Sequence, residues 1–142
     1  MGSLVEDLSL PDDGLVGLSD EEIQLVTRDQ ELDNLPARYV EFLRVMGRSA
    51  GRLLAGTDVF YPDILGLRRD ALELLSENGV AGFIQDGSVV FAMHQGYQVY
   101  WMNGAAADDP PVLMYQEGDS AIHREWDSLA SRWQPKSLRG CA

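Results

Sequence analysis

The sequence predicts an α+β fold with N-terminal helices, a central, mainly antiparallel sheet of four to six strands, and a C-terminal helix packed on the sheet. Apolar residues recur at helical spacing in the first half of the chain, and β-forming residues cluster after residue 80. This order differs from the strand–helix alternation of a parallel sheet. Asp86-Gly87 and Gln95-Gly96 are turn sequences that connect antiparallel strands.

The length of 142 residues predicts one domain with its own core. The single cysteine, Cys141, has no second cysteine to pair with inside the chain, so the fold does not depend on a disulfide. Glu6 and Asp7 stand where a secretory leader carries basic residues, and we therefore expect a cytoplasmic protein. We divide the chain into an irregular acidic arm (1–17), a domain (18–134) and a tail (135–142).

The first helix is predicted to begin at Ser19, because Ser19 and Glu22 have the spacing of a capping box. It should extend to Arg28 or Gln30. The second helix is predicted over 36–46, with a proline in its first turn and Gly47 as a left-handed cap. One apolar stripe follows this helix: Leu35, Tyr39, Phe42, Leu43 and Met46.

A third helix is predicted from Leu67 to just before Gly79. Between the second and third helices, residues 48–62 read as two short strands or as a loop with a strand at each end. We expect Arg68-Arg69, the basic doublet of the third helix, to lie on its solvent-exposed face.

The predicted sheet begins with a strand over 80–84, which the Asp86-Gly87 turn connects to a strand over 88–94. Further strands are predicted over 97–102 and 112–115. In the strand 97–102, Tyr97 and Trp101 are expected in the core, whereas Tyr100 on the opposite face fits the core and an interface equally. The last helix is expected to begin near Asp119 or Ser120 and to end before Pro135.

The charge is strongly acidic, with 11 Lys and Arg against 23 Asp and Glu, a net charge of −12. Residues 1–33 carry ten acids and one base, which is −9 of that total. Such a surface disfavours nucleic acid and anionic membranes as partners and attracts a basic protein. The alternative is that the charge only keeps the protein soluble.

No residue pattern in the sequence indicates catalysis. His94 and His123 lack a second metal ligand at a suitable spacing, and no serine has the context of a nucleophile elbow. The glycines are spaced as turns and not as a phosphate-binding loop. We therefore predict no metal, no cofactor and no enzymatic activity. One alternative to the binding functions given below is an enzyme whose active site contains none of these motifs.

The stretch from Leu35-Pro36 through Phe42-Leu43 to Gly47 resembles the opening of the SUKH superfamily, which includes bacterial immunity proteins and relatives of a yeast cell-wall synthesis regulator. The segment 56–62 and the aromatic-rich hairpins further on follow in the order typical of that family. The resemblance covers about residues 18–133. It implies an α+β domain that binds and neutralises a cognate bacterial polymorphic toxin, often a nuclease, by occlusion. The alternative that it implies is a non-catalytic regulatory or scaffold module.

A basic toxin would be attracted to acidic side chains at the surface. We expect the partner to contact the first helix and the strand and loop near residues 100–109. The predicted partner-binding residues are Glu21, Glu22, Asp29, Tyr100, Asp108 and Asp109.

Overall fold

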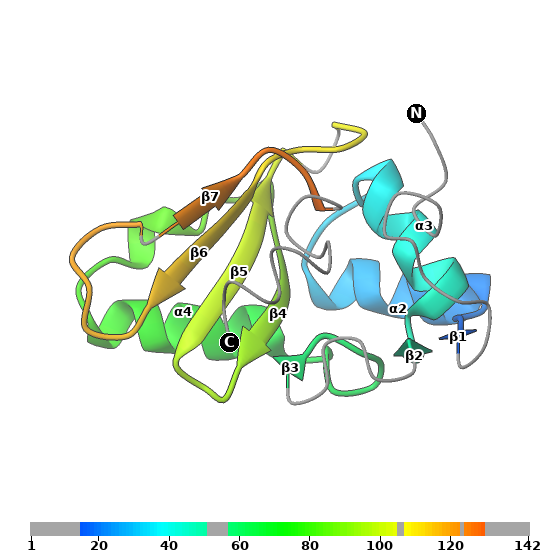
Figure 1. Cartoon of the computed structure of the whole chain (residues 1–142), viewed down its shortest axis with the longest axis horizontal. Helices are drawn as coiled ribbons and strands as arrows, with labels where there is room; N and C mark the ends of the chain where they lie inside the picture. The colour runs from blue at the N-terminus through cyan, green and yellow to red at the C-terminus, as the bar shows by residue number, and fades with distance from the viewer. Residues whose placement is uncertain (1–14, 51–56, 105–106, 123, 130–142) are drawn as a thin grey trace.

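The structure is a computed structural model that describes residues 15–50, 57–104, 107–122 and 124–129. Figure 1 shows the order of its elements along the chain. They are β1 (Leu15–Val16), α2 (Asp20–Asp29), α3 (Ala37–Met46), β2 (Ser49–Ala50), β3 (Thr57–Asp58), α4 (Leu67–Glu77), the short 3₁₀ helix η1 (Ala81–Phe83), β4 (Ser88–His94), β5 (Gln98–Asn103), β6 (Val112–Gln116) and β7 (Arg124–Trp126).

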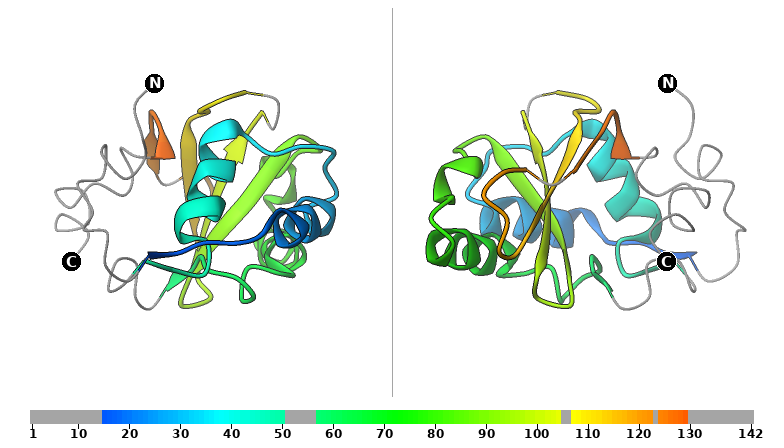
Figure 2. Two further views of the ribbon diagram at one scale, coloured as in Figure 1. Left: turned by 90° about the vertical axis from the view of Figure 1, so that its right-hand side faces the viewer. Right: turned by 60° about the vertical axis from the view of Figure 1, so that its left-hand side comes forward.

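The central sheet has five antiparallel strands in the order β3-β4-β5-β6-β7, which confirms the predicted α+β class and strand number. Helices α3 and α4 lie on opposite faces of this sheet (Figure 2). Successive residues of β5 therefore point into different layers. Tyr100 contacts Phe91, which in turn contacts Tyr39 of α3, whereas Trp101 stacks on Phe83 of η1.

Helix α2 begins as its sequence predicts. The Ser19 hydroxyl accepts a hydrogen bond from the backbone N–H of Glu22 at 3.2 Å, and the Ser19 N–H donates to Glu22 Oε1 at 3.0 Å. This capping box satisfies two backbone groups at the first turn of the helix. The inward face presents Ile23 and Val26, both buried.

Helix α3 buries its whole predicted apolar stripe, but the expected left-handed cap at Gly47 is wrong. Gly47 has φ −64°, a right-handed conformation. A glycine is needed here for space instead: a Cβ would lie 2.6 Å from the Leu43 carbonyl oxygen and 2.8 Å from Leu18 Cγ. The close approach allows the Leu18 N–H to donate to the Leu43 carbonyl at 2.8 Å, which ties the chain before α2 to α3.

The segment 80–84 is not the predicted strand; it forms η1 and a turn. A strand over 80–84 would pair with the first half of β4, but the backbone groups of Val90 in that part of β4 already have a hydrogen-bond partner. The Gln30 side-chain amide accepts from the Val90 N–H at 2.9 Å and donates to the Val90 carbonyl. Phe83 packs instead against the rings of Trp101 and Tyr115.

Arg68 is also buried, so the prediction of a solvated face is wrong for this residue. Its side chain is 9% exposed, and its guanidinium donates to the backbone carbonyls of Gln85 and Ser88. Arg69, the other half of the doublet, is exposed as predicted. Together, Gln30 and Arg68 attach α2 and α4 to the start of β4.

The remaining strands lie close to their predicted places. Gln95 and Gly96 both have positive φ (51° and 78°) and connect β4 to β5 in a tight turn. Between α3 and α4, β2 and β3 both lie within the segment 48–62, for which two short strands are predicted, and β2 pairs with β1. Leu15 and Val16, which we assigned to the arm, thus belong to a two-stranded sheet. Residues 1–14, Leu53 and Leu54 lie outside the described residues.

The last helix does not begin at Asp119 or Ser120. Residues 124–126 form β7, which pairs with β6 through Val112–Trp126 and adds the fifth strand. The Trp126 ring packs on the Tyr100 ring, with 6.2 Å between their centroids. The side chain of Trp126 in the edge strand β7 thus reaches across β6 to β5. The predicted helical stretch from residue 130 on lies outside the described residues.

Candidate protein-binding surface

The outward side of α2 is a polar helix surface with one large apolar side chain at its centre. Because Ile23 and Val26 point into the core, helical spacing turns Glu21, Gln24, Leu25 and Arg28 outward, and all four are exposed. We call these four residues the α2 face. Leu25 is 48% exposed, the highest value among the large hydrophobic residues that the structure describes.

Glu21 is the one acid of the α2 face. Its carboxylate makes no hydrogen bond or ion pair with the described residues, whereas both of its acidic neighbours pair with arginines from the region of α3. Asp20 lies 3.3 Å from Arg44, and Glu22 contacts Arg48. Exposed ion pairs contribute little free energy to stability, so a partner can replace Arg44 as the contact of Asp20.

Glu22 has a structural task that Glu21 lacks. The Ser19 N–H donates to its carboxylate, and this hydrogen bond, with a smaller contribution from Arg48, lowers the pKa of Glu22 from 4.5. A substitution at Glu22 that removes this hydrogen-bond acceptor would therefore disturb the start of α2 as well as any partner contact.

Asp29 is partly buried and connects two helices. Its Oδ2 accepts from the backbone N–H of Gly66 at 2.8 Å, directly before α4. The carboxylate thus serves the contact between α2 and α4. It lies at the far end of α2 from Glu21, nine residues from the first helical residue.

Asp108 and Asp109 lie beside the first turn of α3. The Asp108 carbonyl accepts from the Arg38 N–H at 2.8 Å, while its side chain is exposed. Asp109 Oδ2 lies 3.6 Å from Arg38 Nε, and Glu41 Oε1 lies 2.7 Å from Arg38 Nη1. Arg38 is 3% exposed, so this buried cation holds the loop against the helix and offsets the charge of both acids.

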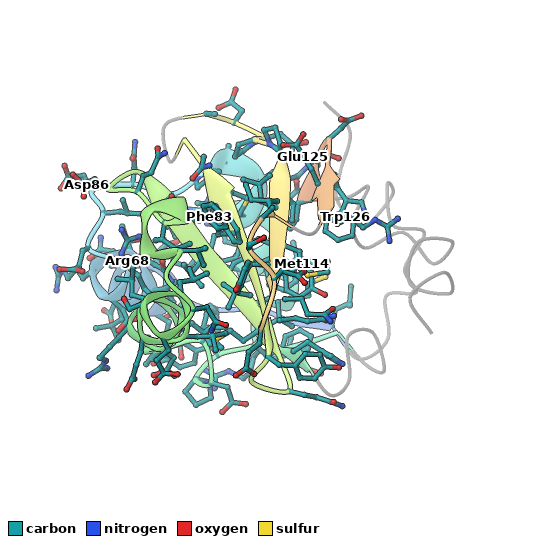
Figure 3. The ribbon with its side chains drawn as sticks, turned by 90° about the vertical axis from the view of Figure 1, so that its left-hand side faces the viewer. Arg68, Phe83, Asp86, Met114, Glu125 and Trp126 are labelled. Atoms are coloured by element: carbon teal, nitrogen blue, oxygen red, sulfur yellow. The ribbon has the colours of Figure 1, made fainter. Side chains whose placement is uncertain are left out.

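Tyr100 is a core residue, with only 4% of its surface exposed. Its ring lies between Phe91 and Trp126, and its hydroxyl donates to Gln98 Oε1 at 3.1 Å. Figure 3 shows Met114 and Trp126 on the side of the sheet away from α4, the same side that carries Tyr100. A partner can reach little of this tyrosine.

The predicted residues therefore do not form one surface. Asp20 and Glu22 contact Arg44 and Arg48, at the end of α3, whereas Asp109 contacts Arg38 at its beginning. The two acidic groups lie at opposite ends of a helix of ten residues, about 15 Å long. Glu21 and the Asp108 side chain remain as the two openly exposed members.

Sequence reasoning missed two things at this surface: the exposed Leu25 and the buried Arg38. Helical spacing contains a signal for the second, because residues 35, 38, 39 and 42 share one side of α3. The same spacing places Arg68 with Ala71 and Leu75 on the buried side of α4. In both helices the residue type was given more weight than the position.

The described residues give no support for a metal centre. No group of three or more His, Cys, Asp or Glu side chains among them could hold a metal ion. His94 lies at the end of β4, with its ring at the edge of Tyr97, 6.0 Å between centroids. His123 and Cys141 fall outside this part of the chain.

A comparison with known protein families finds no family model that matches this chain, and no curated protein shows significant similarity to it. None of the helices in the described part of the chain combines the length and the apolar character that a membrane span requires.

Proposed function

We propose that this chain is a cytoplasmic, bacterial immunity protein that binds a cognate basic toxin, of the nuclease type, and neutralises it by steric and electrostatic occlusion. The proposal rests on the resemblance to the SUKH superfamily. The observation that carries its mechanism is the α2 face, where the exposed Leu25 lies one helical turn after Glu21, a glutamate with no ion-pair partner among the described residues, on a chain of net charge −12.

The charge of the chain and the leucine of this surface have separate physical tasks. The α2 face itself has one acid, Glu21, and one base, Arg28, so the negative field comes from the chain as a whole, and it raises the rate at which a cationic partner arrives in the right orientation. A central apolar side chain that becomes desolvated on binding then slows dissociation. An occluding protein needs rapid, tight association and no chemistry of its own, which agrees with our expectation that the chain is not an enzyme.

The α2 face alone is too small for a stable interface, since such interfaces bury about 800 Å² on each partner. Val16 of β1 is a second exposed apolar residue, at 46%. Its carbonyl accepts from the Arg48 N–H at 2.8 Å, and the Arg48 side chain contacts Glu22 in the first turn of α2. We therefore place the partner over α2 and β1.

The test is to co-express the chain with the toxin encoded beside its own gene and to measure growth and nuclease activity. We expect growth to be restored and the activity of the purified toxin to be lost at an equimolar ratio. A stable complex that leaves the toxin active would favour the regulatory or scaffold alternative. Turnover of a compound by this chain, lost on changing one side chain, would show that it is an enzyme.

A further inference from the structure

A pocket of about 320 Å³ lies between the end of α2 and the start of α4, at the lower end of the size range of small-molecule sites. Its walls carry charges of both signs. It is lined by Asp29, Glu31, Gly66, Arg68, Arg69 and Leu72. None of these residues belongs to the α2 face, although Asp29 is the last residue of α2, so ligand binding in the pocket can be tested without the toxin.

The positive wall is held rigidly in place. Two guanidinium nitrogens of Arg68 are fixed by the carbonyls of Gln85 and Ser88, and Arg68 lies in the first turn of α4, on the side of the sheet that this helix covers (Figure 3). The third nitrogen, Nε, is buried and has no hydrogen-bond partner among the described residues; a carboxylate oxygen of Glu31 is 3.9 Å away. A buried donor without an acceptor is costly, so a ligand oxygen at this place would be favourable.

Arg69 adds a second cation to the same wall. Its Nη2 lies 3.4 Å from the position that a Cβ on Gly66 would occupy, so its guanidinium lies over the turn that opens α4. The first turn of this eleven-residue helix also directs its partial positive charge toward the pocket.

The negative wall has one fixed and one movable carboxylate. Asp29 is held by the Gly66 N–H at 2.8 Å. The Glu31 side chain is 80% exposed and can turn, although its backbone is held at φ 58° with its N–H on the Arg28 carbonyl at 2.9 Å. Glu31 is therefore free to exchange its long contact with Arg68 for a contact with a ligand cation.

The charges select the class of ligand. A simple anion would be repelled by Asp29 and Glu31, and a simple cation by Arg68 and Arg69. A small molecule that carries a carboxylate and an ammonium a few ångströms apart satisfies both walls, and Leu72 offers apolar contact to a side chain. We propose that this pocket binds a free α-amino acid, with its carboxylate facing Arg68 and Arg69 and its ammonium facing Glu31.

The test is a titration of the full chain, followed by NMR amide shifts, with glycine, L-serine and L-leucine as probes. We expect saturable shifts at Glu31, Gly66 and Arg69 with at least one of the three, below about 10 mM ligand. Two derivatives of an amino acid that binds serve as controls. The N-acetyl derivative lacks the ammonium group, and the amide lacks the carboxylate. Each derivative should bind about tenfold more weakly.

Two variants probe the two walls and leave the hydrogen bonds from Arg68 to Gln85 and Ser88 in place. Arg69→Gln and Glu31→Gln should each weaken binding about tenfold, whereas Glu73→Gln, an exposed change on α4 outside the pocket, should leave it unaltered. The proposal is overturned if none of the three amino acids gives saturable shifts, if the derivatives bind equally well, or if the pocket variants bind as tightly as the Glu73 control.

Discussion

At the scale of single residues, two buried polar side chains determine how the helices meet the sheet. Gln30 is 1% exposed, and its amide pairs with both backbone groups of Val90, as a neighbouring strand would. Arg68 takes the carbonyls of Gln85 and Ser88 just before and at the start of β4. Polar groups in such places are costly when they lose their partners.

Replacing Gln30 by methionine, which keeps the length of the side chain, should therefore destabilise the fold. Both hydrogen bonds to Val90 are lost, and the buried N–H and carbonyl stay unsatisfied, at a cost of about 2–4 kcal/mol. Chemical denaturation measures the free energy of unfolding. Gln24→Met, an exposed change on the same helix, is the control. Equal losses in the two variants would show that the pairing with Val90 contributes nothing.

At the scale of elements, the start of α2 combines a cap with a titratable group. The pKa of Glu22 is lowered in the folded state, chiefly by the hydrogen bond from the Ser19 N–H. Its contribution to stability is therefore complete above the unfolded pKa of about 4.5 and is lost as the pH falls through the folded value.

The variant Glu22→Gln keeps a side chain that can complete the capping box but does not titrate. We expect the wild-type protein to lose stability more steeply than this variant when the pH falls from about 5 to about 3. Thermal unfolding across this range measures the difference, with Glu21→Gln as the control for removing a carboxylate from the same turn. Parallel curves for wild type and Glu22→Gln would contradict the assigned role.

The elements that the sequence predicts correctly have local causes. Ser19 and Glu22 cap α2 from within one turn, and Gln95-Gly96 forms a tight turn through its own backbone preferences. The sheet order follows because consecutive strands pair. Such features need no knowledge of distant parts of the chain.

The wrong predictions all depend on contacts between distant residues. The segment 80–84 has the composition of a strand, but Gln30, which is distant in the sequence, already occupies the edge of β4. Gly47 reads as a left-handed cap, yet its role is to let Leu18 approach α3. Trp126 has helical spacing with its neighbours, and its pairing with Val112 makes it part of a strand.

The candidate surface was predicted less well than the fold, because acidic residue types alone do not distinguish free carboxylates from structural ones. Of the six predicted residues, Glu21 and Asp108 expose their side chains freely, whereas Asp29 and Asp109 support neighbouring elements. Tyr100 belongs to the core. Asp29 is held by Gly66 and Asp109 by Arg38, and both partners are distant in the sequence. A local sequence pattern therefore does not show that these carboxylates are already engaged.

At the scale of the whole molecule, the net charge of −12 is the feature that the proposed function uses most. A field of this kind acts over about 10 Å at moderate salt and is screened beyond that distance. It therefore affects the rate of association far more than the lifetime of the complex. The exposed Leu25 should have the opposite effect, because its desolvation is complete only in the docked complex.

The association rate constant with the cognate toxin, measured by stopped-flow at about 20 and about 200 mM NaCl, tests this account most directly. Glu21→Lys should slow association several-fold at the lower salt, and more than Glu73→Lys, which changes the net charge equally from an exposed position on α4. Leu25→Ala should leave the association rate unchanged and speed dissociation about tenfold. Association that is independent of salt and equal in the two charge variants would contradict electrostatic occlusion through α2.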